Sequence, residues 1–383
     1  MSQLPAPDEA ALAHSTRLTQ HIRQQIEQAG GWISFADFMQ LALYTPGLGY
    51  YSGGATKFGG AGDFTTAPEM TPLFGRTLAR QMSDILPHTE ANVLEFGAGS
   101  GKLALDILLE LEQLGRLPRT YYILDLSADL RERQQRTLQQ HARHLLPRVE
   151  WIDELPSSFS GVMLGNEVMD AMPAHLVRLD RSGWRETGAG LAEGQLDWQT
   201  RPLADSRLVH LCNQLNVTAP YQTEISLANR GFIRTLAERL TKGLILLIDY
   251  GFGADEYYHP QRNQGTLMCH YRHHAHDDAF FLPGLQDITV HVDFTAVAQT
   301  AIDHGLDLHG YTTQAHFLLN AGIGKLLEQL DPGNLPRYLP QAGAVQKLLN
   351  PAEMGELFKV IALSRSLDIP LQGFSSGDRS RML

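Results

Sequence analysis

The feature that most constrains this 383-residue chain is a glycine-rich stretch placed where a strand is expected to turn into a helix. Residues 93–96 (VLEF) read as a short strand, residues 97–101 as GAGSG, and the segment from Lys102 onward has helical spacing. In open α/β sheets a ligand binds outside the carboxyl ends of the strands, and glycines let the backbone approach it closely. The stretch therefore predicts a site for a nucleoside-bearing cofactor, with a tight structural turn as the alternative.

The surrounding pattern predicts an α/β fold. From about Asn92 strand-like and helix-like segments alternate, and parallel strands need such crossover connections. Residues 243–251 (GLILLIDYG) are nearly continuously apolar, as expected for a strand buried on both faces. Residues 358–364 read as a late strand that closes the sheet, and residues 295–350 as mostly helical. We therefore expect a Rossmann-like, mostly parallel sheet with helices on both faces.

Two further regions differ from this core. Helices are predicted over 8–29, from an N-cap at Ser34 to about 45, and over 72–85, with a glycine-rich loop between Gly49 and Pro68. Short alternating pieces over 176–202 suggest an inserted β-meander. The expected division is an N-terminal helical extension (1–88), a core (89–294), a helical lobe (295–350) and a closing strand with a tail (351–383).

The composition excludes several classes of binding partner and site. Forty-two acidic against 31 basic residues give a formal charge of −11, which disfavours nucleic acid and anionic lipid. Two cysteines supply neither a disulfide framework nor a CxxC metal pair. No apolar stretch approaches the roughly 20 residues of a membrane helix, and the N-terminus shows no signal or organelle presequence. Cytoplasmic residence is the resulting expectation.

The glycine spacing favours one cofactor class over two others. A dinucleotide fingerprint would need a small residue where Lys102 stands, and a phosphate-binding loop would need Ser or Thr where Leu103 stands. The spacing E-x-G-x-G-x-G instead resembles the first motif of class I S-adenosylmethionine-dependent methyltransferases. This resemblance implies that Gly97, Gly99 and Gly101 approach the amino-acid part of the cofactor and that Glu95 faces its ammonium group.

Two acids are candidates for the nucleoside part. Asp125 ends the next strand 24 residues after Gly101, about where α/β cofactor sites place an acid for the ribose hydroxyls. A carboxylate accepts hydrogen bonds from two vicinal hydroxyls, and the alternative is a solvated acid at a strand end. Asp153, after the third expected strand, is a weaker candidate for the adenine amino group, since acids after strands are common helix caps.

Two more acids are candidates for the methyl acceptor. Glu167 and Asp170 follow the fourth expected strand, and a helical turn there would present both on one face. Two carboxylates can bind a guanidinium bidentately and orient a nitrogen lone pair toward a methyl group. The alternative is that Asp170 caps a helix and that Glu167 forms a buried ion pair.

Several motifs together resemble the MidA-like family, which comprises the mitochondrial complex I assembly methyltransferase and its bacterial relatives. The resemblance runs from about Ser34 to Phe294 in matching order and is carried by GYYSGG (49–54), GDFTTAPEM (62–70), LFGR (73–76), LEFGAGSG (94–101), GNEVMDAMP (165–173), LIDYG (247–251) and GTLMCHYRHH…PGLQDITVHVDF (265–294). It implies a class I methyltransferase core whose glycines and Asp125 hold the cofactor and whose Glu167 and Asp170 line the substrate pocket. Many relatives carry Glu in place of Asp125.

The loop over 62–69 is part of that family signature. Asp63, Thr65, Thr66 and Glu69 could fold over the cofactor and exclude water, and we include Asp63, Thr65 and Thr66 among the expected cofactor-binding residues. The alternative is a rigid loop packed on the core. The histidine-rich run 271–278 lacks the spacing of a metal site, so no metal is expected.

The sequence as a whole predicts an enzyme that transfers a methyl group from S-adenosylmethionine to an exposed arginine of a protein. The resemblance implies a respiratory complex I subunit as acceptor, and we also expect a homodimer as one assembly state. Two alternatives stay open: a methyltransferase for small hydroxyl or amine substrates, and a non-catalytic assembly factor that keeps the cofactor pocket as structure.

Overall fold

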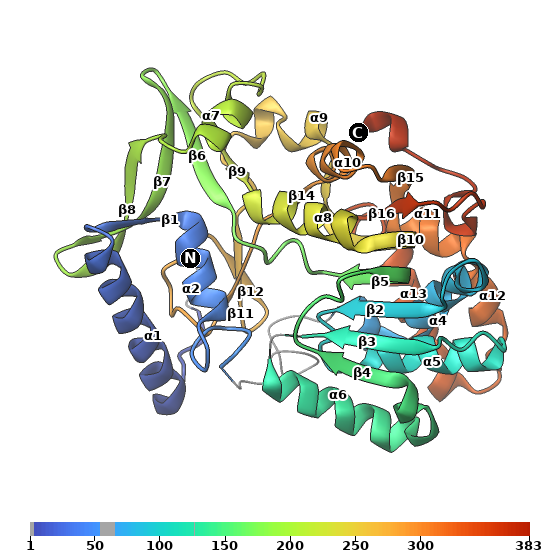
Figure 1. Ribbon diagram of the computed structural model, residues 1–383. Helices are drawn as coiled ribbons and strands as arrows, with labels where there is room; N and C mark the ends of the chain where they lie inside the picture. The colour runs from blue at the N-terminus through green and yellow to red at the C-terminus, as the bar shows by residue number, and fades with distance from the viewer. Residues whose placement is uncertain (1–3, 54–65, 126) are drawn as a thin grey trace. The chain divides into compact units, whose positions relative to one another are not determined.

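The computed structural model of the protein describes residues 4–53, 66–125 and 127–383 (Figure 1). Its contacts divide the chain into two compact units, each built from three segments. Unit 1 comprises residues 1–64, 169–231 and 253–293, and unit 2 comprises 65–168, 232–252 and 294–383. The division expected from the sequence runs linearly along the chain. The two units instead alternate along it, because strands that are distant in sequence pair with one another.

Unit 2 contains the predicted α/β sheet, with strands in the order β15-β16-β10-β5-β2-β3-β4. The five strands from β10 to β4 run parallel, and β16 runs antiparallel to both β10 and β15. The strands are β2 (Asn92–Phe96), β3 (Thr120–Leu124), β4 (Val149–Ile152), β5 (Phe159–Asn166), β10 (Leu240–Phe252), β15 (Asp307–Thr313) and β16 (Phe358–Arg365).

The strand order reverses at β2, and this reversal positions the candidate site. From β2 the chain adds β3 and β4 on one side, then returns to place β5 and β10 on the other. In parallel register Phe96 at the end of β2 lies beside Gly165 near the end of β5. The crevice outside the carboxyl ends of two such strands is where open α/β sheets bind their ligands.

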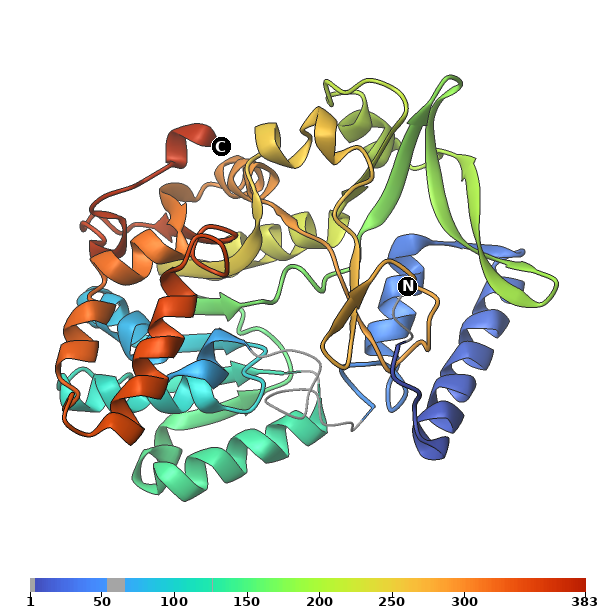
Figure 2. The ribbon, with the colours of Figure 1, turned by 180° about the vertical axis from the view of Figure 1, so that it is seen from behind.

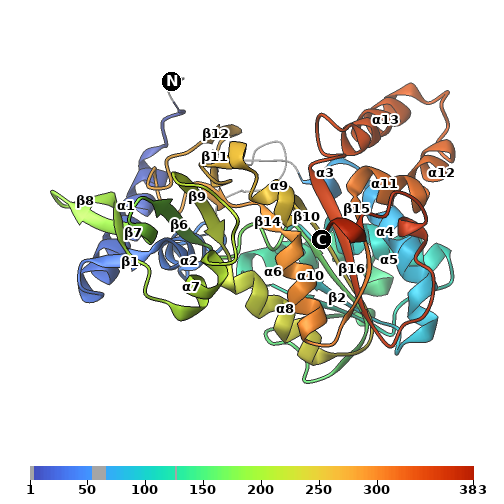
Figure 3. The same ribbon diagram turned by 90° about the horizontal axis from the view of Figure 1, so that it is seen from above.

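Helices cover both faces of the sheet, as predicted. Side chains of α4 (Pro72–Ile85), α5 (Lys102–Gln113) and α6 (Ala128–His141) join one buried apolar cluster with residues of the strands. On the opposite face the Phe232 ring of α8 (Leu227–Arg239) packs edge-on against Phe96, at 5.1 Å between centroids. Figure 3 shows α8 and α10 (Phe294–Asp303) on one side of the sheet and α4 and α5 on the other.

The C-terminal third corrects one expectation. Residues 295–350 are mostly helical, as expected, with α11 (Gln314–Asn320), α12 (Ile323–Glu328) and α13 (Leu335–Leu349), but they also contain strand β15, which the sequence analysis did not predict. The segment 307–313 (DLHGYTT) has no sustained apolar run, and its extended form comes from pairing with β16 some fifty residues later. The closing strand β16 is confirmed (Figure 2).

Unit 1 is built on antiparallel pairing. Its main sheet has the order β1-β7-β6-β9, with β8 paired to β7, so that the β-meander predicted over 176–202 is confirmed. A smaller sheet has the order β12-β11-β13. The strands of these two sheets are β1 (Trp32–Ser34), β6 (His175–Asp180), β7 (Gly183–Ala192), β8 (Gln195–Pro202), β9 (Tyr221–Ile225), β11 (Met268–Tyr271), β12 (His274–His276) and β13 (Asp287–Thr289), and the short strand β14 (Val292–Asp293) lies outside both sheets.

The N-terminal helices begin where they are predicted, and the second begins at its predicted cap, Ser34. The Asp8 side chain accepts a hydrogen bond from Ala11 N at the start of α1 (Glu9–Gln28), and the Ser34 hydroxyl accepts one from Asp37 N at the start of α2 (Phe35–Tyr44). The remaining short helices are α3 (Ala67–Met70) of unit 2, α7 (Ser206–Cys212) and α9 (Ala254–Tyr257). Among the described residues, no helix is both long and apolar enough to span a membrane.

Gly161, at the start of β5, offers a test of the central sheet. Its φ is +154°, and a Cβ there would lie 2.0 Å from the carbonyl oxygen of Asn92 on β2. We expect Gly161→Ala to lower the free energy of unfolding by about 2–5 kcal/mol, because two packed strands would have to separate. Denaturant titration followed by circular dichroism measures this loss.

The matched control is Gly115→Ala. Gly115 also has a positive φ of +65°, but a Cβ there would meet no atom within 4 Å. It should cost only about 1 kcal/mol of backbone strain. Equal losses in the two variants would contradict the close approach of β2 and β5.

Candidate active site

The glycine turn after β2 has the conformation that its sequence suggests. Gly97, Gly99 and Gly101 have φ values of +62°, +53° and +81°, in the left-handed region that side chains disfavour. The N–H of Gly97 donates to Leu124 O at 3.0 Å, which joins the turn to the end of β3. Gly101 is the N-terminal cap of α5, so the turn leads directly into that helix.

Glu95 lies just before this turn and is fully buried. The Tyr121 hydroxyl donates to its Oε2 at 2.6 Å. Burial raises the pKa of the Glu95 carboxyl to about 7; the hydrogen bond from Tyr121 opposes this rise and the charge of Asp125 adds to it. Glu95 therefore exchanges a proton near neutral pH.

Asp125 directly follows β3, as predicted, and is held by two donors. Its Oδ1 accepts from Ser127 N at 3.0 Å and its Oδ2 from Gln134 Nε2 at 2.8 Å. The Asp125 carbonyl also accepts from the Arg131 guanidinium at 2.9 Å. The carboxylate is thus fixed in direction at the carboxyl end of the sheet.

Asp153 directly follows β4 and is exposed. Its side chain is 86% exposed and forms an ion pair with Arg131, at 2.7 Å between Oδ1 and Nη2. Arg131 also donates to Ile152 O at 2.8 Å. Asp153 therefore flanks the end of β4 on the solvent side.

The backbone at Glu167 differs from the expected helical turn. Glu167 has φ +54°, and residues 167–170 form bends and turns in place of a helix. The strand pairing of β5 with β10 continues into this segment, because Glu167 N donates to Ile248 O at 2.8 Å. Asn166 Nδ2 donates to the Glu167 carboxylate at 2.9 Å. A non-glycine residue in this conformation is strained and points to a functional constraint.

Asp249 of β10 anchors the same segment, and the sequence assigned it no role. It is fully buried, and its Oδ2 accepts from Val168 N at 3.2 Å while its Oδ1 accepts from Tyr250 N at 2.9 Å. The Val168 side chain in turn lies over the glycine turn, since a Cβ on Gly97 would be 3.7 Å from Val168 Cγ2. The turn after β5 therefore packs on the turn after β2.

Asp170 belongs to unit 1 and lies among buried polar groups there. Its carbonyl accepts from Val290 N at 3.0 Å, and its side chain is buried. The Tyr51 hydroxyl donates to both carboxylate oxygens of Asp287, at 3.0 and 3.1 Å. Burial raises the pKa of Tyr44 and Tyr51, and the charges of Asp287 and Asp170 raise it further. Two buried aspartates and two neutral phenols therefore share one region of unit 1.

The family loop is only partly described. Asp63 and Thr65 lie outside the described residues, whereas Thr66 is buried at the start of α3. Glu69 of α3 accepts a hydrogen bond from the Ser100 hydroxyl in the glycine turn. The end of the loop thus contacts the turn after β2.

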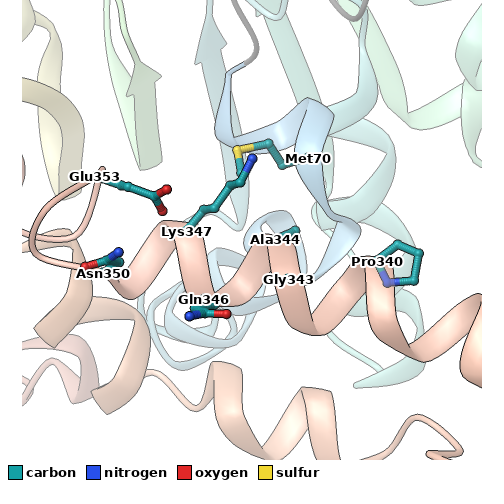
Figure 4. Close-up of a pocket in the computed structure, with 8 residues that line it drawn as sticks. All are labelled: Met70, Pro340, Gly343, Ala344, Gln346, Lys347, Asn350 and Glu353. Carbon is teal, nitrogen blue, oxygen red and sulfur yellow. The ribbon is translucent and has the colours of Figure 1, made fainter.

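A cavity in unit 2 lies apart from these residues. It measures about 510 Å³ and is bounded by Met70 of α3 and by α13 and its C-terminal flank, including Lys347, Asn350 and Glu353 (Figure 4). It contains none of the predicted site residues. In the part of the chain that the structure describes, no three His, Cys, Asp or Glu side chains are grouped to hold a metal ion.

Comparison with known proteins agrees with this architecture. A family model described as "Putative S-adenosyl-L-methionine-dependent methyltransferase" matches residues 73–312. The Danio rerio protein named protein arginine methyltransferase NDUFAF7, mitochondrial, is 29% identical, over 91% of this chain and 90% of its own. The Homo sapiens protein of the same name is 28% identical, over 91% and 83% of the two chains.

The expectation of cytoplasmic residence is contradicted by these relatives, which are named as mitochondrial proteins. It rested on seeing no presequence pattern among the first residues, and that observation does not fix a compartment.

Solved structures give a closer match. A Burkholderia thailandensis protein crystallised with bound S-adenosyl-homocysteine is 49% identical, with a TM-score of 0.97 over 100% of both chains. A native crystal structure from the same organism is 48% identical, with a TM-score of 0.93 over 100% of both chains. Together with the family match and the glycine turn at the strand-order reversal, these similarities show that the chain belongs to the S-adenosyl-L-methionine-dependent methyltransferase family.

Proposed function

We propose that this methyltransferase binds S-adenosylmethionine at the carboxyl end of β2 and transfers its methyl group to an arginine of a protein. The glycine turn and Glu95 would hold the amino-acid part of the cofactor, and Asp125 its ribose. Glu167 and Asp170 would receive the acceptor. Roles for Asp63, Thr65, Thr66 and Asp153 stay predictions.

The residues at the turn fit this cofactor. Three left-handed glycines form a turn without side chains at the carboxyl end of β2, and Gly101 also lets α6 pack closely on this turn, since a Cβ there would lie 2.8 Å from Gln134 Cα. The buried carboxylates of Glu95 and Asp125 match an ammonium group and a pair of vicinal hydroxyls. S-adenosylmethionine requires a backbone turn that can approach it closely, one acid for its ammonium group and one acid for its ribose hydroxyls.

The observation that carries the acceptor proposal is the held, strained position of Glu167. Two hydrogen bonds hold Glu167 beside the glycine turn. Glu167 N donates to Ile248 O, and Val168 N donates to the Asp249 carboxylate, both on β10. A carboxylate there can orient a guanidinium and favour the charge it carries. The bound cofactor supplies an activated methyl group, so the task left to this chain is to position the nucleophile.

The names of the relatives support arginine as the acceptor group. Proteins called protein arginine methyltransferase align with this chain over more than four-fifths of their length. The net charge of −11 suits a basic, arginine-bearing segment. A respiratory complex I subunit as acceptor stays a prediction from the family resemblance, and a homodimer stays a prediction without support from that resemblance.

The direct test uses the purified protein, methyl-labelled S-adenosylmethionine and an extract of cells that lack this protein. Label should enter protein bands and be recovered as methylarginine by mass spectrometry after hydrolysis. Label confined to the small-molecule fraction would contradict a protein acceptor, and binding of the cofactor without transfer would favour a non-catalytic role.

Cofactor affinity should depend on pH through Glu95. Its pKa of about 7 in the free protein means that the carboxylate is mostly protonated at pH 6 and mostly ionised at pH 8. Because an ammonium group binds the ionised form, the affinity for S-adenosylhomocysteine should fall roughly tenfold from pH 8 to pH 6. Calorimetric titration at several pH values measures this change.

Glu95→Gln is the control for that titration, since it keeps an acceptor for Tyr121 but loses the charge. Its affinity should vary with pH only as the ligand itself does. A pKa raised by burial also means that the native protein loses stability as the pH rises through 7, and Glu95→Gln should abolish this loss. Identical pH profiles in the two proteins would remove Glu95 from the ammonium site.

Glu167→Gln should separate catalysis from cofactor binding. We expect kcat to fall about 100-fold, because the neutral amide cannot orient or stabilise a guanidinium equally well. The dissociation constant for S-adenosylhomocysteine should change less than about threefold, since the glycine turn is intact. Steady-state transfer assays and calorimetry give the two numbers.

Glu90→Gln is the matched surface control. Glu90 is an exposed acid at the opposite, amino-terminal end of β2, and its substitution should leave both quantities unchanged. Full activity of Glu167→Gln would exclude Glu167 from the catalytic role.

A further inference from the structure

Gln134 of α6 is an unusual residue in its surroundings. The helix is strongly polar, and its buried residues are Gln134 and Leu138. Gln134 is 0% exposed, whereas its neighbour Gln135 is exposed. Burial of an amide is costly unless its N–H donors and its oxygen form hydrogen bonds. The partners of the Gln134 amide therefore decide whether its burial is favourable.

Each group of the Gln134 amide has a partner at a different strand end. Trp151 Nε1, on β4, donates to Gln134 Oε1 at 2.9 Å. Gln134 Nε2 donates to Asp125 Oδ2 after β3 at 2.8 Å and to Gly99 O in the turn after β2 at 3.2 Å. One buried side chain therefore joins the carboxyl ends of three successive strands.

The direction of the amide follows from the chemistry of Trp151. An indole N–H can only donate, so the amide oxygen must face Trp151 and the amide nitrogen must face Asp125 and Gly99. In a flipped amide, the nitrogen would face the indole N–H of Trp151, which is also a donor. The amide oxygen would face Asp125 Oδ2 and Gly99 O, which are also acceptors. Trp151 thereby fixes which group Gln134 offers to Asp125.

Backbone contact between α6 and the glycine turn supports the same arrangement. A Cβ on Gly101 would lie 2.8 Å from Gln134 Cα. One helical turn later the Thr137 hydroxyl donates to Ser100 O at 2.8 Å. The face of α6 that carries Gln134 is therefore fitted to the turn and cannot shift without moving it.

We infer that Gln134 is a positioning residue of the cofactor site, which sets the Asp125 carboxylate at a fixed distance and direction from the glycine turn. It acts through Asp125 and Gly99 and is oriented by Trp151. The inference rests on the proposed ribose role of Asp125 and is independent of the methyl acceptor. Without Gln134, Asp125 could turn away from the direction that two vicinal hydroxyls need.

The test compares two ligands by calorimetry: S-adenosylhomocysteine and its analogue without the ribose 2′-hydroxyl. The native protein should prefer the complete ligand by about tenfold or more, as expected for a site built to bind a hydroxyl. In Gln134→Leu the affinity for the complete ligand should fall about tenfold, and the preference should shrink below about threefold. Asp125→Asn should reduce the preference in the same way.

Gln81→Leu is the matched control. Gln81 of α4 is also a fully buried glutamine of unit 2, and its Oε1 accepts from Gly373 N at 2.7 Å. Both leucine variants should lower the thermal unfolding midpoint, but Gln81→Leu should keep the native preference between the two ligands.

The outcomes separate the two proposals. A native preference in Asp125→Asn refutes the ribose role of Asp125, and the inference about Gln134 falls with it. A reduced preference in Asp125→Asn with a native preference in Gln134→Leu overturns the inference alone. If Gln134→Leu does not fold, Trp151→Phe decides, since it removes only the donor that orients the amide: a reduced preference supports the inference and an unchanged one overturns it.

Discussion

The reversal of strand order at β2 is the constraint on which the rest of unit 2 depends. β3 and β5 lie on opposite sides of β2, so the connections that follow β2 and β5 run in opposite directions. The turns at the carboxyl ends of these two strands are therefore not covered by a crossover connection. The chain fills this position with left-handed glycines after β2 and with a strained Glu167 after β5. The Val168 side chain lies against the turn after β2, so the reversal brings Glu167 close to the glycine turn.

Buried polar side chains then hold each turn in place. Asp249 fixes the turn after β5 by accepting a hydrogen bond from Val168 N, and Gln134 fixes the turn after β2 by donating to Gly99 O. A buried polar group that loses its partner costs about 1–3 kcal/mol, so these contacts resist displacement. The apolar clusters of the sheet give stability, whereas these few contacts give the site its geometry.

The sequence was sufficient to predict the features that depend on local residue patterns. The helix cap at Ser34, the alternating core, the glycine turn and the location of Asp125 all follow from spacing and residue type. Features that depend on distant partners were missed or wrong. β15 is extended because it pairs with β16, and Glu167 is left-handed because β10 holds its backbone. Nothing in the run of polar residues around Gln134 distinguishes it from Gln135, since only the packing of α6 on the glycine turn buries one of the two.

The way the two cofactor acids are held explains why they suit a cationic ligand. Tyr121 donates to Glu95, and Gln134 and Ser127 donate to Asp125. These donors are neutral, so they orient the carboxylates without cancelling their charge. Burial raises the pKa of Glu95, and the charge of Asp125 raises it further. S-adenosylmethionine carries a sulfonium and an ammonium group. In the proposed site, binding of such a ligand places positive charge beside Glu95, which favours the ionised form of a carboxyl whose pKa burial has raised to about 7.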